Sequence, residues 1–366
     1  MKLPTRKHNI EKSTLSLSLS LSLSSRLRNS VKRTEGFTIV ELLIVIVVIA
    51  ILAAITIVSY NGITQRAKES AKASELSSWK KKSELRKVEK SITCPENYSF
   101  VYGNTVLGTD DFCVMKYEAK NVGGVATSQA SGAPWVSISQ TDAITASTAT
   151  GGHLLTDAEW MTIAADVLSV KYNWSGSEVG SGIIWQGHVN NNPGSALAAS
   201  ADDTDNLNGM TGGIGANSGN NSSRVLYLSS GDTIWDLSGN VYEWTQQAVG
   251  TPALTMNQVG VSGDSGFNWR EWTLGSLSLG NLPASSRPST LASYTNPITG
   301  SSLSAITGWD ATKGVGRIYA NYADAGSRAF VRGGYWSNGA NAGVLTLSLG
   351  SSPSYTNTNF GFRVAR

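Results

Sequence analysis

The segment from Gly36 to Val58 constrains this chain more than any other part of the sequence. It reads GFTIVELLIVIVVIAILAAITIV, and residues 37–58 are long and apolar enough for a helix that crosses the hydrocarbon core of a bilayer. A lone carboxylate, that of Glu41, lies near its start, where a charge costs roughly 2.5–3.5 kcal/mol in an apolar core. Cleavage after Gly36 would give Phe37 a free amine one helical turn from Glu41, able to neutralise that carboxylate in its own or a neighbouring chain. An ordinary single-pass anchor with a chance glutamate is the alternative.

These residues resemble the start of type IV prepilins and of the related pseudopilins. The resemblance implies that a prepilin peptidase cleaves after Gly36 and methylates Phe37, and that Glu41 pairs with the amine of a neighbouring pilin subunit during fibre assembly. It also implies a precursor held in the cell membrane through residues 37–58. The mature protein would then lie on the cell surface or in a pilus, with its head outside the cytoplasm.

Charge and composition divide the chain into parts with different expected positions. Residues 1–36 carry eight basic and two acidic side chains, so this leader should stay on the cytoplasmic side and be removed. Residues 59–90 are polar, rich in Ala, Lys and Glu and free of proline, which predicts a helical stalk that continues the apolar helix. Residues 91–366, the predicted head, carry a net charge of −7, which argues against nucleic acid as a partner.

The head has the composition of a loop-rich exported domain. The chain contains 38 Gly and 11 Trp, but only 15% of its residues are charged. Cys94 and Cys113 both follow the apolar segment, so one disulfide is expected, with two free thiols as the alternative. One helix is predicted at residues 156–170, where Thr156 and Glu159 have the spacing of a capping box ahead of an apolar helical repeat.

Three segments of the head carry a second resemblance. They are FCVMKYEA at residues 112–119, IWDLSGNVYEWT at 234–245, and the run 331–366, which begins VRGGYW and ends NFGFRVAR. They are similar to the formylglycine-generating-enzyme or sulfatase-modifying-factor domain, a variant of the C-type lectin fold. The expected fold class is therefore α+β: a long N-terminal pilin helix, first transmembrane and then stalk, followed by a loop-rich lectin-like head.

The head lacks the ligands on which the chemistry of the related enzymes depends. The oxidases of the family bind copper through a late pair of cysteines, and no cysteine follows Cys113. The related sulfoxide synthases use a histidine-rich iron site, and only His153 and His188 lie beyond the leader. The sequence therefore predicts neither a catalytic residue nor a required cofactor. Family members often bind calcium near the GNxxEW element, so Asn240 and Glu243 are candidate oxygen ligands for a structural calcium ion.

The C-terminal segment gives the functional hypothesis. Residues 344–349 read VLTLSL, a strand pattern that turns its leucines inward and leaves Thr346, Ser348 and Gly350 on a face that is free to vary. The segment resembles the variable region of target proteins of diversity-generating retroelements, in which adenine-directed mutagenesis rewrites chosen codons. Tyrosine beside serine and glycine also suits a binding surface, since it combines rigid aromatic contact with adaptable polar groups. The predicted ligand-binding residues are Tyr335, Ser337, Ser348, Gly350, Ser351 and Tyr355. An undiversified domain with a chance Ser- and Asn-rich end is the alternative.

These features together predict a pilus-associated surface protein whose non-enzymatic, lectin-like head recognises an external protein or glycan. Two other functions remain open from the sequence. One is a structural pilin or type II secretion pseudopilin without a ligand. The other is a metal-dependent, oxidase-like enzyme with a divergent site.

Overall fold

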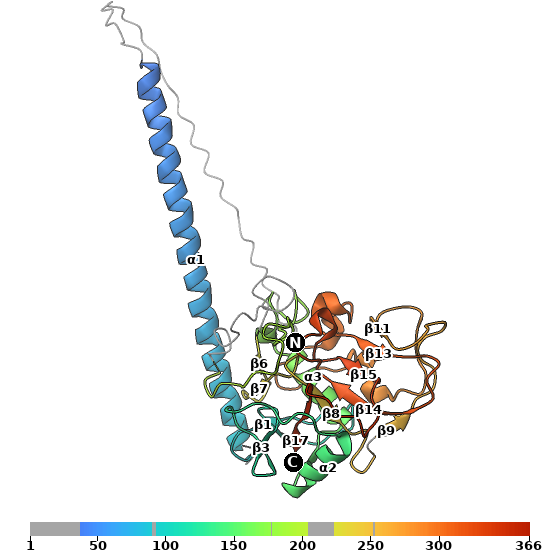
Figure 1. The fold of residues 1–366 in the computed structure, drawn as a ribbon. Coiled ribbons are helices and arrows are strands. Elements are labelled where there is room, and N and C mark those ends of the chain that lie inside the picture. Colours follow the sequence, from blue (N-terminus) through green and yellow to red (C-terminus); the bar gives the residue numbers. More distant parts are fainter. Residues whose placement is uncertain (1–36, 90–92, 177, 204–222, 252) are drawn as a thin grey trace, which may run out of the picture. The chain divides into compact units, whose positions relative to one another are not determined.

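The structure is a computed structural model that describes residues 37–89, 93–176, 178–203, 223–251 and 253–366 (Figure 1). The chain divides into two compact units, Met1–Lys68 and Glu69–Arg366. The predicted leader, including Gly36, lies outside the described residues.

Helix α1 (Ile39–Glu89) is continuous through the residues expected to form the assembly helix and the stalk. Its start has the reciprocal hydrogen bonds of a capping box. The Thr38 N–H donates to Glu41 Oε2 at 2.8 Å, and the Glu41 N–H donates to Thr38 Oγ1 at 3.3 Å. Among the residues that the structure describes, no helix combines the length and apolar character that a membrane crossing requires.

The largest sheet of the described residues has the strand order β11-β13-β15-β14-β8-β16, with β9 paired to the start of β14. Strand β15 is central, parallel to β13 and antiparallel to β14, while β16 runs parallel to β8. The strands are β8 (Tyr242–Thr245), β9 (Ala253–Thr255), β11 (Asn268–Arg270), β13 (Ile318–Ala320), β14 (Ser327–Arg332), β15 (Leu347–Ser348) and β16 (Phe360–Phe362).

The register of these strands gives the sheet two chemically different faces, because residues directly opposite one another share a face. One face, called the aromatic face below, carries the cross-strand row Trp269, Tyr319, Ser348, Val331, Trp244 and Phe362. The opposite face carries the row Ile318, Leu347, Arg332 and Glu243. Leu347 and Ile318 there belong to a buried apolar cluster, and Arg332 reaches the first turn of α3.

Two helices cover this sheet from its two sides. Helix α3 (Asp157–Leu168) begins with the predicted capping box of Thr156 and Glu159, which is confirmed. Helix α2 (Gln140–Ala149) begins at Ser139, whose side chain accepts the Asp142 N–H. Ala143 of α2 packs in one buried cluster with aromatic-face residues of β8, β14 and β16. The aromatic face is therefore covered at that end of the sheet. The short helix α4 spans Pro288–Leu291.

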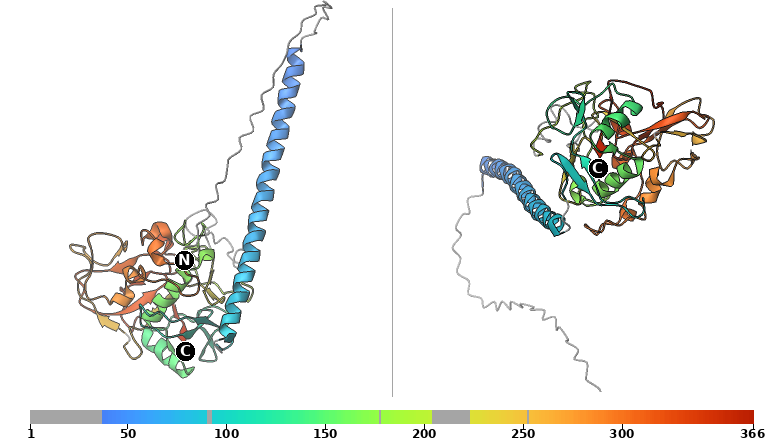
Figure 2. Two further views of the ribbon diagram at one scale, coloured as in Figure 1. Left: turned by 180° about the vertical axis from the view of Figure 1, so that it is seen from behind. Right: turned by 90° about the horizontal axis from the view of Figure 1, so that it is seen from below.

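The chain ends inside a second sheet of order β1-β2-β17-β5 within the described residues. Arg366 donates to the Thr150 carbonyl, which places the C-terminus beside the end of α2 (Figure 2).

Cys94 and Cys113 form the expected disulfide, with a Cα–Cα distance of 5.6 Å. The strands of this sheet are β1 (Tyr98–Val101), β2 (Phe112–Met115), β5 (His153–Leu154) and β17 (Val364–Ala365). The two-stranded pairs are β3 (Lys120–Val122) with β4 (Val125–Thr127), β6 (Val225–Tyr227) with β7 (Thr233–Trp235), and β10 (Val259–Val261) with β12 (Leu277–Leu279).

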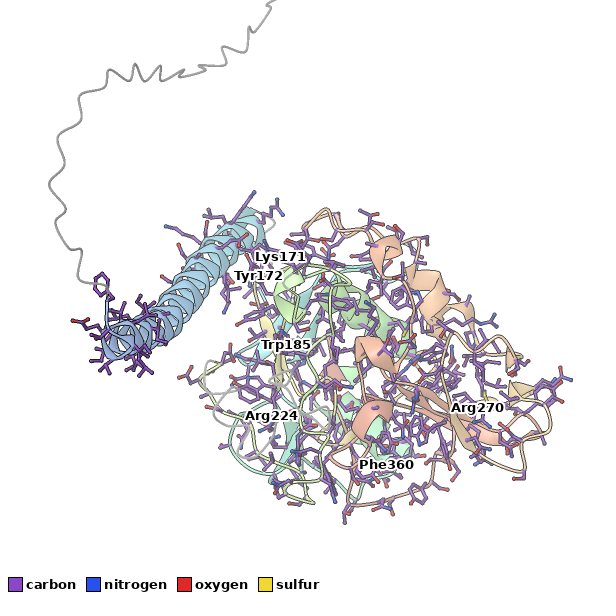
Figure 3. The ribbon with its side chains drawn as sticks, turned by 90° about the horizontal axis from the view of Figure 1, so that it is seen from above. Lys171, Tyr172, Trp185, Arg224, Arg270 and Phe360 are labelled. Carbon is purple, nitrogen blue, oxygen red and sulfur yellow. A yellow bond between two sulfur atoms is a disulfide. The ribbon has the colours of Figure 1, made fainter. Side chains whose placement is uncertain are left out.

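The last turns of α1 belong to the second unit and pack on it. The Trp79 ring lies 5.6 Å from that of Tyr172, and Lys87 Nζ pairs with Asp232 Oδ1 at 2.6 Å. Ser83 is buried and donates to the Ser229 carbonyl. A cavity of about 580 Å³ lies along this contact, next to Lys171 and Tyr172 (Figure 3).

Candidate ligand-binding surface

The six predicted ligand-binding residues divide into surface and buried groups. Ser337 and Tyr355 are exposed, and Tyr335 and Gly350 are half-buried. Ser348 and Ser351 are buried, with exposed fractions of 5% and 9%. The structure therefore leaves four of the six at the surface of the described residues.

The prediction of a freely variable strand face at residues 346–350 is wrong for Thr346 and Ser348. On the aromatic face, Ser348 lies between Tyr319 of β13 and Val331 of β14, and its side chain is buried there. Thr346 is fully buried, and its hydroxyl donates to the Asn341 carbonyl at 2.7 Å. The inward leucines are as expected, since Leu345, Leu347 and Leu349 are all buried. Alternation alone could not reveal that the second face is covered as well.

A row of aromatic rings connects the two predicted tyrosines. The ring of Tyr335 lies 5.0 Å from that of Tyr242, which lies 5.0 Å from that of Phe360. The Phe360 ring in turn lies 5.3 Å from the ring of Tyr355. The GNVYEW element and the NFGFRV element, about 120 residues apart in sequence, thus supply Tyr242 and Phe360, the buried middle of the row. The two variable-segment tyrosines lie at its outer ends. We call these four residues the tyrosine row.

The two inner residues of the tyrosine row, Tyr242 and Phe360, pack on core residues other than Tyr335 and Tyr355. Phe360 also packs on Trp244, whose indole N–H donates to the Ile138 carbonyl at 2.9 Å. Burial raises the pKa of the Tyr242 phenol well above its usual range, and the nearby phenols of Tyr335 and Tyr319 raise it further. The middle of the row is buried and neutral. Changes at positions 335 and 355 can therefore alter the surface without removing core side chains.

Glycine at position 350 allows a close approach between the variable segment and strand β13. A Cβ at this position would lie 2.9 Å from Cε1 of the Tyr319 ring. Tyr319 is half-buried, so a larger residue at position 350 would displace this ring rather than the backbone. Sequence reasoning did not find Tyr319, because its place beside Gly350 depends on the pairing of β13 with β15.

The residues proposed for pilus assembly have local roles in the structure. Phe37 is exposed, and the Glu41 carboxylate accepts bonds from the backbone N–H and the hydroxyl of Thr38, each at 2.8 Å. The Thr-x-x-Glu spacing that signals this cap was visible in the sequence. Glu41 is thus a helix cap in the single chain, in addition to its expected role between chains.

Asn240 and Glu243 do not fit a calcium site. The only side-chain oxygen of Asn240 accepts the Leu197 N–H at 2.7 Å, and both oxygens of Glu243 accept from Arg363 Nε at 2.8 Å. A calcium ion would have to displace a buried guanidinium that already neutralises the carboxylate. Among the described residues, no group of three or more His, Cys, Asp or Glu side chains is placed to hold a metal ion.

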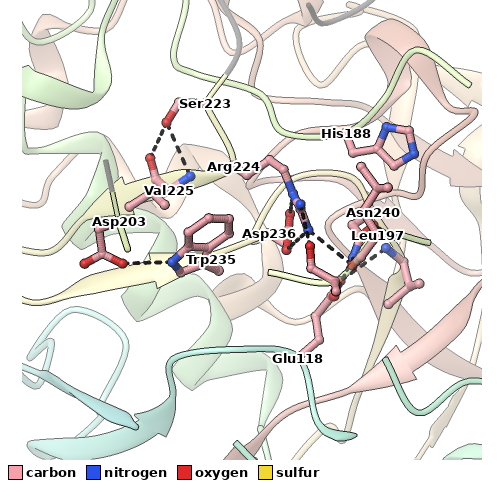
Figure 4. A network of polar contacts seen from close by, with 12 residues as sticks. Glu118, His188, Leu197, Asp203, Ser223, Arg224, Val225, Trp235, Asp236 and Asn240 are labelled. Carbon is pink, nitrogen blue, oxygen red and sulfur yellow. Dashed lines mark hydrogen bonds and ion pairs between the residues drawn. The ribbon is translucent and has the colours of Figure 1, made fainter. Parts of the chain in front are cut away.

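A network of buried charges surrounds Asn240 instead (Figure 4). Arg224 donates from Nε and Nη2 to the two oxygens of Asp236, each at 2.7 Å. Asn240 Nδ2 donates to Glu118 Oε2 at 2.6 Å, and the Val241 N–H donates to Glu118 Oε1 at 3.2 Å. Burial, with the Asp236 charge as the second cause, raises the pKa of Glu118 to about 8. This network fixes the GNVYEW element that supports the tyrosine row.

The raised pKa of Glu118 predicts that stability falls as pH rises. The folded head keeps a proton that an unfolded glutamate, with a pKa of 4.5, releases. The contribution is complete below about pH 4.5 and is lost through about pH 8, with a slope of up to about 1.4 kcal/mol per pH unit for one proton. Urea unfolding at several pH values should show this decline in the wild type and a flatter profile in Glu118→Gln. The comparison is made above pH 7, because burial also raises the pKa of Asp166 to about 6 and that of Glu243 to about 7. Equal slopes in the two proteins would remove Glu118 as the cause.

Two family models match this chain, one over the head and one over its N-terminal segment. Residues 86–366 match the family described as the Sulfatase-modifying factor enzyme 1-like domain. The chain belongs to this family. Residues 31–57 match the Prokaryotic N-terminal methylation motif, so the pilin-like start and the head are each matched separately. The search of curated proteins found no match.

Solved structures similar to this chain include the Major Tropism Determinant U1 Variant, at 12% identity and a TM-score of 0.28 over 74% of this chain and 52% of that chain. PvdO from Pseudomonas aeruginosa is similar at 13% identity and a TM-score of 0.28, over 70% of this chain and 81% of that one. Treponema denticola variable protein 1 is similar at 13% identity and a TM-score of 0.27, over 75% of this chain and 92% of that one. The chain spans about half the length of the Major Tropism Determinant structure.

Proposed function

We propose that this protein is a pilin-like surface protein whose head recognises an external ligand, a protein or a glycan on another cell, a phage or a surface. The prepilin motif supports a membrane-held precursor that a prepilin peptidase processes and that joins pilin subunits in a fibre. The observation that carries the recognition role is the tyrosine row, with Tyr335 and Tyr355 at the surface on a buried aromatic support.

The strands under these tyrosines are joined in a way that suits a binding surface. Arg363, which follows β16, is fully buried and pairs with Glu243 of β8, so the strands that carry the row are joined by charge as well as by hydrogen bonds. Tyr355 is 41% exposed, and its hydroxyl accepts from Asn357 Nδ2 at 2.9 Å. A rigid aromatic side chain with a polar end is well suited to recognition, because little conformational entropy is lost on binding. Many copies on one fibre would raise the avidity of even a weak site.

The proposal extends to diversification of this surface. The asparagine-rich runs NGANAG at residues 338–343 and TNTN at 356–359 follow Tyr335 and Tyr355, respectively, in sequence. A nearby reverse transcriptase gene and a template repeat that differs from this segment only at adenines are expected in the genome. If either is missing, the diversification hypothesis is wrong, whereas the proposal of ligand recognition is unaffected.

Replacing both Tyr335 and Tyr355 by alanine should lower adhesion of fibre-bearing cells by roughly tenfold or more. Aromatic residues at the centre of an interface often contribute over 2 kcal/mol each. Adhesion is measured on a panel of bacterial cells, phage particles and glycan-coated beads, with fibres counted by electron microscopy. Tyr227→Ala is the matched control, since it removes a half-buried tyrosine that packs near Trp79 instead. Unchanged adhesion by the double variant, with intact fibres, would make the protein a structural subunit.

A further inference from the structure

The first asparagine of the run NGANAG, Asn338, is half-buried and turns its side chain toward Tyr335. Its Oδ1 accepts the Tyr335 N–H at 3.0 Å, and its own N–H donates to the Tyr335 carbonyl at 3.0 Å. The two residues therefore close a small ring of hydrogen bonds. Because the side-chain bond goes to the backbone of residue 335, it does not depend on which side chain that position carries.

The same amide reaches the inner neighbour of Tyr335 in the tyrosine row. Tyr242 is 7% exposed, and its ring lies 5.0 Å from that of Tyr335. Burial raises the pKa of the Tyr242 phenol, and a hydrogen bond with the Asn338 side chain opposes part of this rise. A group that donates to the phenol oxygen lowers its pKa, so Nδ2 of Asn338 is the partner. One amide thus bonds the backbone of one row member and the hydroxyl of the next.

Gly334 leaves the room that the Asn338 oxygen occupies. Its φ is +85°, and a Cβ there would lie 2.6 Å from Cβ of Ala342 and 3.3 Å from Oδ1 of Asn338. A side chain at position 334 would therefore press on the turn that carries Asn338. The second glycine of the RGGYW element is compatible with the contact for this reason.

The backbone of this turn is also anchored without the Asn338 side chain. The Trp336 N–H donates to the Asn240 carbonyl at 3.1 Å, and the Trp336 carbonyl accepts the Asn191 N–H at 2.6 Å. Both bonds use main-chain atoms, so they do not require the amide at position 338. Removing that amide should release Tyr335 without unfolding the turn.

We propose that Asn338 is a positioning residue of the ligand-binding surface, whose amide holds Tyr335 beside Tyr242 before a ligand arrives. This inference rests on the proposed recognition function and deepens it. A tyrosine that is already held in place loses less conformational freedom when it contacts a ligand. Asn338 should therefore persist in natural variants in which positions 335 and 337 change.

The first test is hydrogen exchange of the full-length protein in detergent, read by mass spectrometry with overlapping peptides that resolve the Tyr335 amide. In Asn338→Ala this amide should exchange roughly tenfold faster or more, because its acceptor is gone. Asn338→Asp should keep the protection, because a carboxylate oxygen accepts the same bond. Asn341→Ala is the matched control, since it removes a half-buried asparagine of the same run whose Oδ1 accepts from Arg317 Nη1 instead. Exchange at Tyr335 should then equal that of the wild type.

The second test is adhesion of fibre-bearing cells to bacterial cells, phage particles and glycan-coated beads. Asn338→Ala should lower adhesion by roughly threefold to tenfold, with unchanged fibre number and urea unfolding midpoint. Asn338→Asp should restore most of the loss, and Asn341→Ala should adhere as the wild type does. A role in stability alone would lower the unfolding midpoint and would not separate these variants by adhesion.

Unchanged exchange at Tyr335 in Asn338→Ala would overturn the positioning role. Faster exchange throughout the head would also overturn it, since Asn338 would then stabilise the fold as a whole. These outcomes are distinct from a failure of the proposed function. If adhesion depends on Tyr335 and Tyr355 but not on Asn338, recognition is unaffected and the positioning role is wrong. If Asn338→Ala frees the Tyr335 amide but the double tyrosine variant adheres normally, the proposed binding surface is wrong.

Discussion

Replacing Arg332 with methionine should lower the free energy of unfolding of the head by roughly 3–5 kcal/mol. Arg332 and Asp157 are both fully buried, and Arg332 donates from Nε and Nη2 to the two carboxylate oxygens at 2.6 and 2.8 Å. The pair joins β14, the strand that leads to the tyrosine row, to the first turn of α3. Methionine has a similar length but leaves the Asp157 carboxylate buried without its cation. Urea unfolding of the full chain measures the loss.

An arginine-to-methionine substitution at another position of β14, Arg328→Met, provides the control. Arg328 of β14 also pairs with an aspartate, Asp324, but the two side chains are 22% and 13% exposed. Because water screens a pair that it can reach, Arg328→Met should lower the unfolding free energy by no more than about 1 kcal/mol. Adding Asp157→Asn to Arg332→Met should restore part of the loss, since the remaining amide carries no charge. Equal losses for Arg332→Met and Arg328→Met would show that burial of the pair is not what makes it important.

The parts of the fold that the sequence predicted correctly depend on residues close together in the chain. The long helix followed from an apolar run joined to an Ala- and Lys-rich run, and α3 followed from Thr156 and Glu159. Both signals act within one helical turn, so no knowledge of the tertiary structure was needed. Helix α2 was missed because its sequence, QTDAITASTA, is rich in threonine and has no apolar repeat. Its one local signal was the spacing of Ser139 and Asp142 at the N-cap.

The errors concern contacts between distant segments. Ser348 alternates with leucines as a surface residue would, yet its side chain is buried, with Tyr319 of β13 and Val331 of β14 directly across from it. Residues near 319 come to lie beside residues near 269 and 350 only after the sheet has formed. The tyrosine row shows both cases: its outer members could be proposed from composition, whereas Tyr242 and Phe360 were named only as parts of family motifs. A single sequence does not contain the register that brings them together.

Glu41→Gln should block incorporation of the subunit into fibres by roughly tenfold or more while leaving the helix cap intact. Glutamine is accepted at the third position of a capping box, so the bonds with Thr38 can persist in this variant. It cannot neutralise the amine of a neighbouring Phe37, which would be left as an unpaired charge in an apolar fibre core. A difference of about 1.4 kcal/mol in packing free energy suffices for a tenfold effect. Incorporation is measured as the ratio of this protein in sheared fibres to that in membranes, with cleavage after Gly36 followed by mass spectrometry.

Thr38→Val is the complementary variant, because it perturbs the helix cap of Glu41 and leaves the charge proposed to pair between chains. It removes the hydroxyl that receives the Glu41 N–H but keeps the carboxylate, so it should weaken the helix start by about 0.5–2 kcal/mol and still allow incorporation. If Thr38→Val fails and Glu41→Gln assembles normally, the carboxylate is only a helix cap and the pairing between chains is wrong. If Glu41→Gln fails and Thr38→Val assembles, the charge itself is required. The capping box makes this distinction possible, because glutamine and glutamate satisfy the same backbone bonds and differ in the one property that assembly is proposed to use.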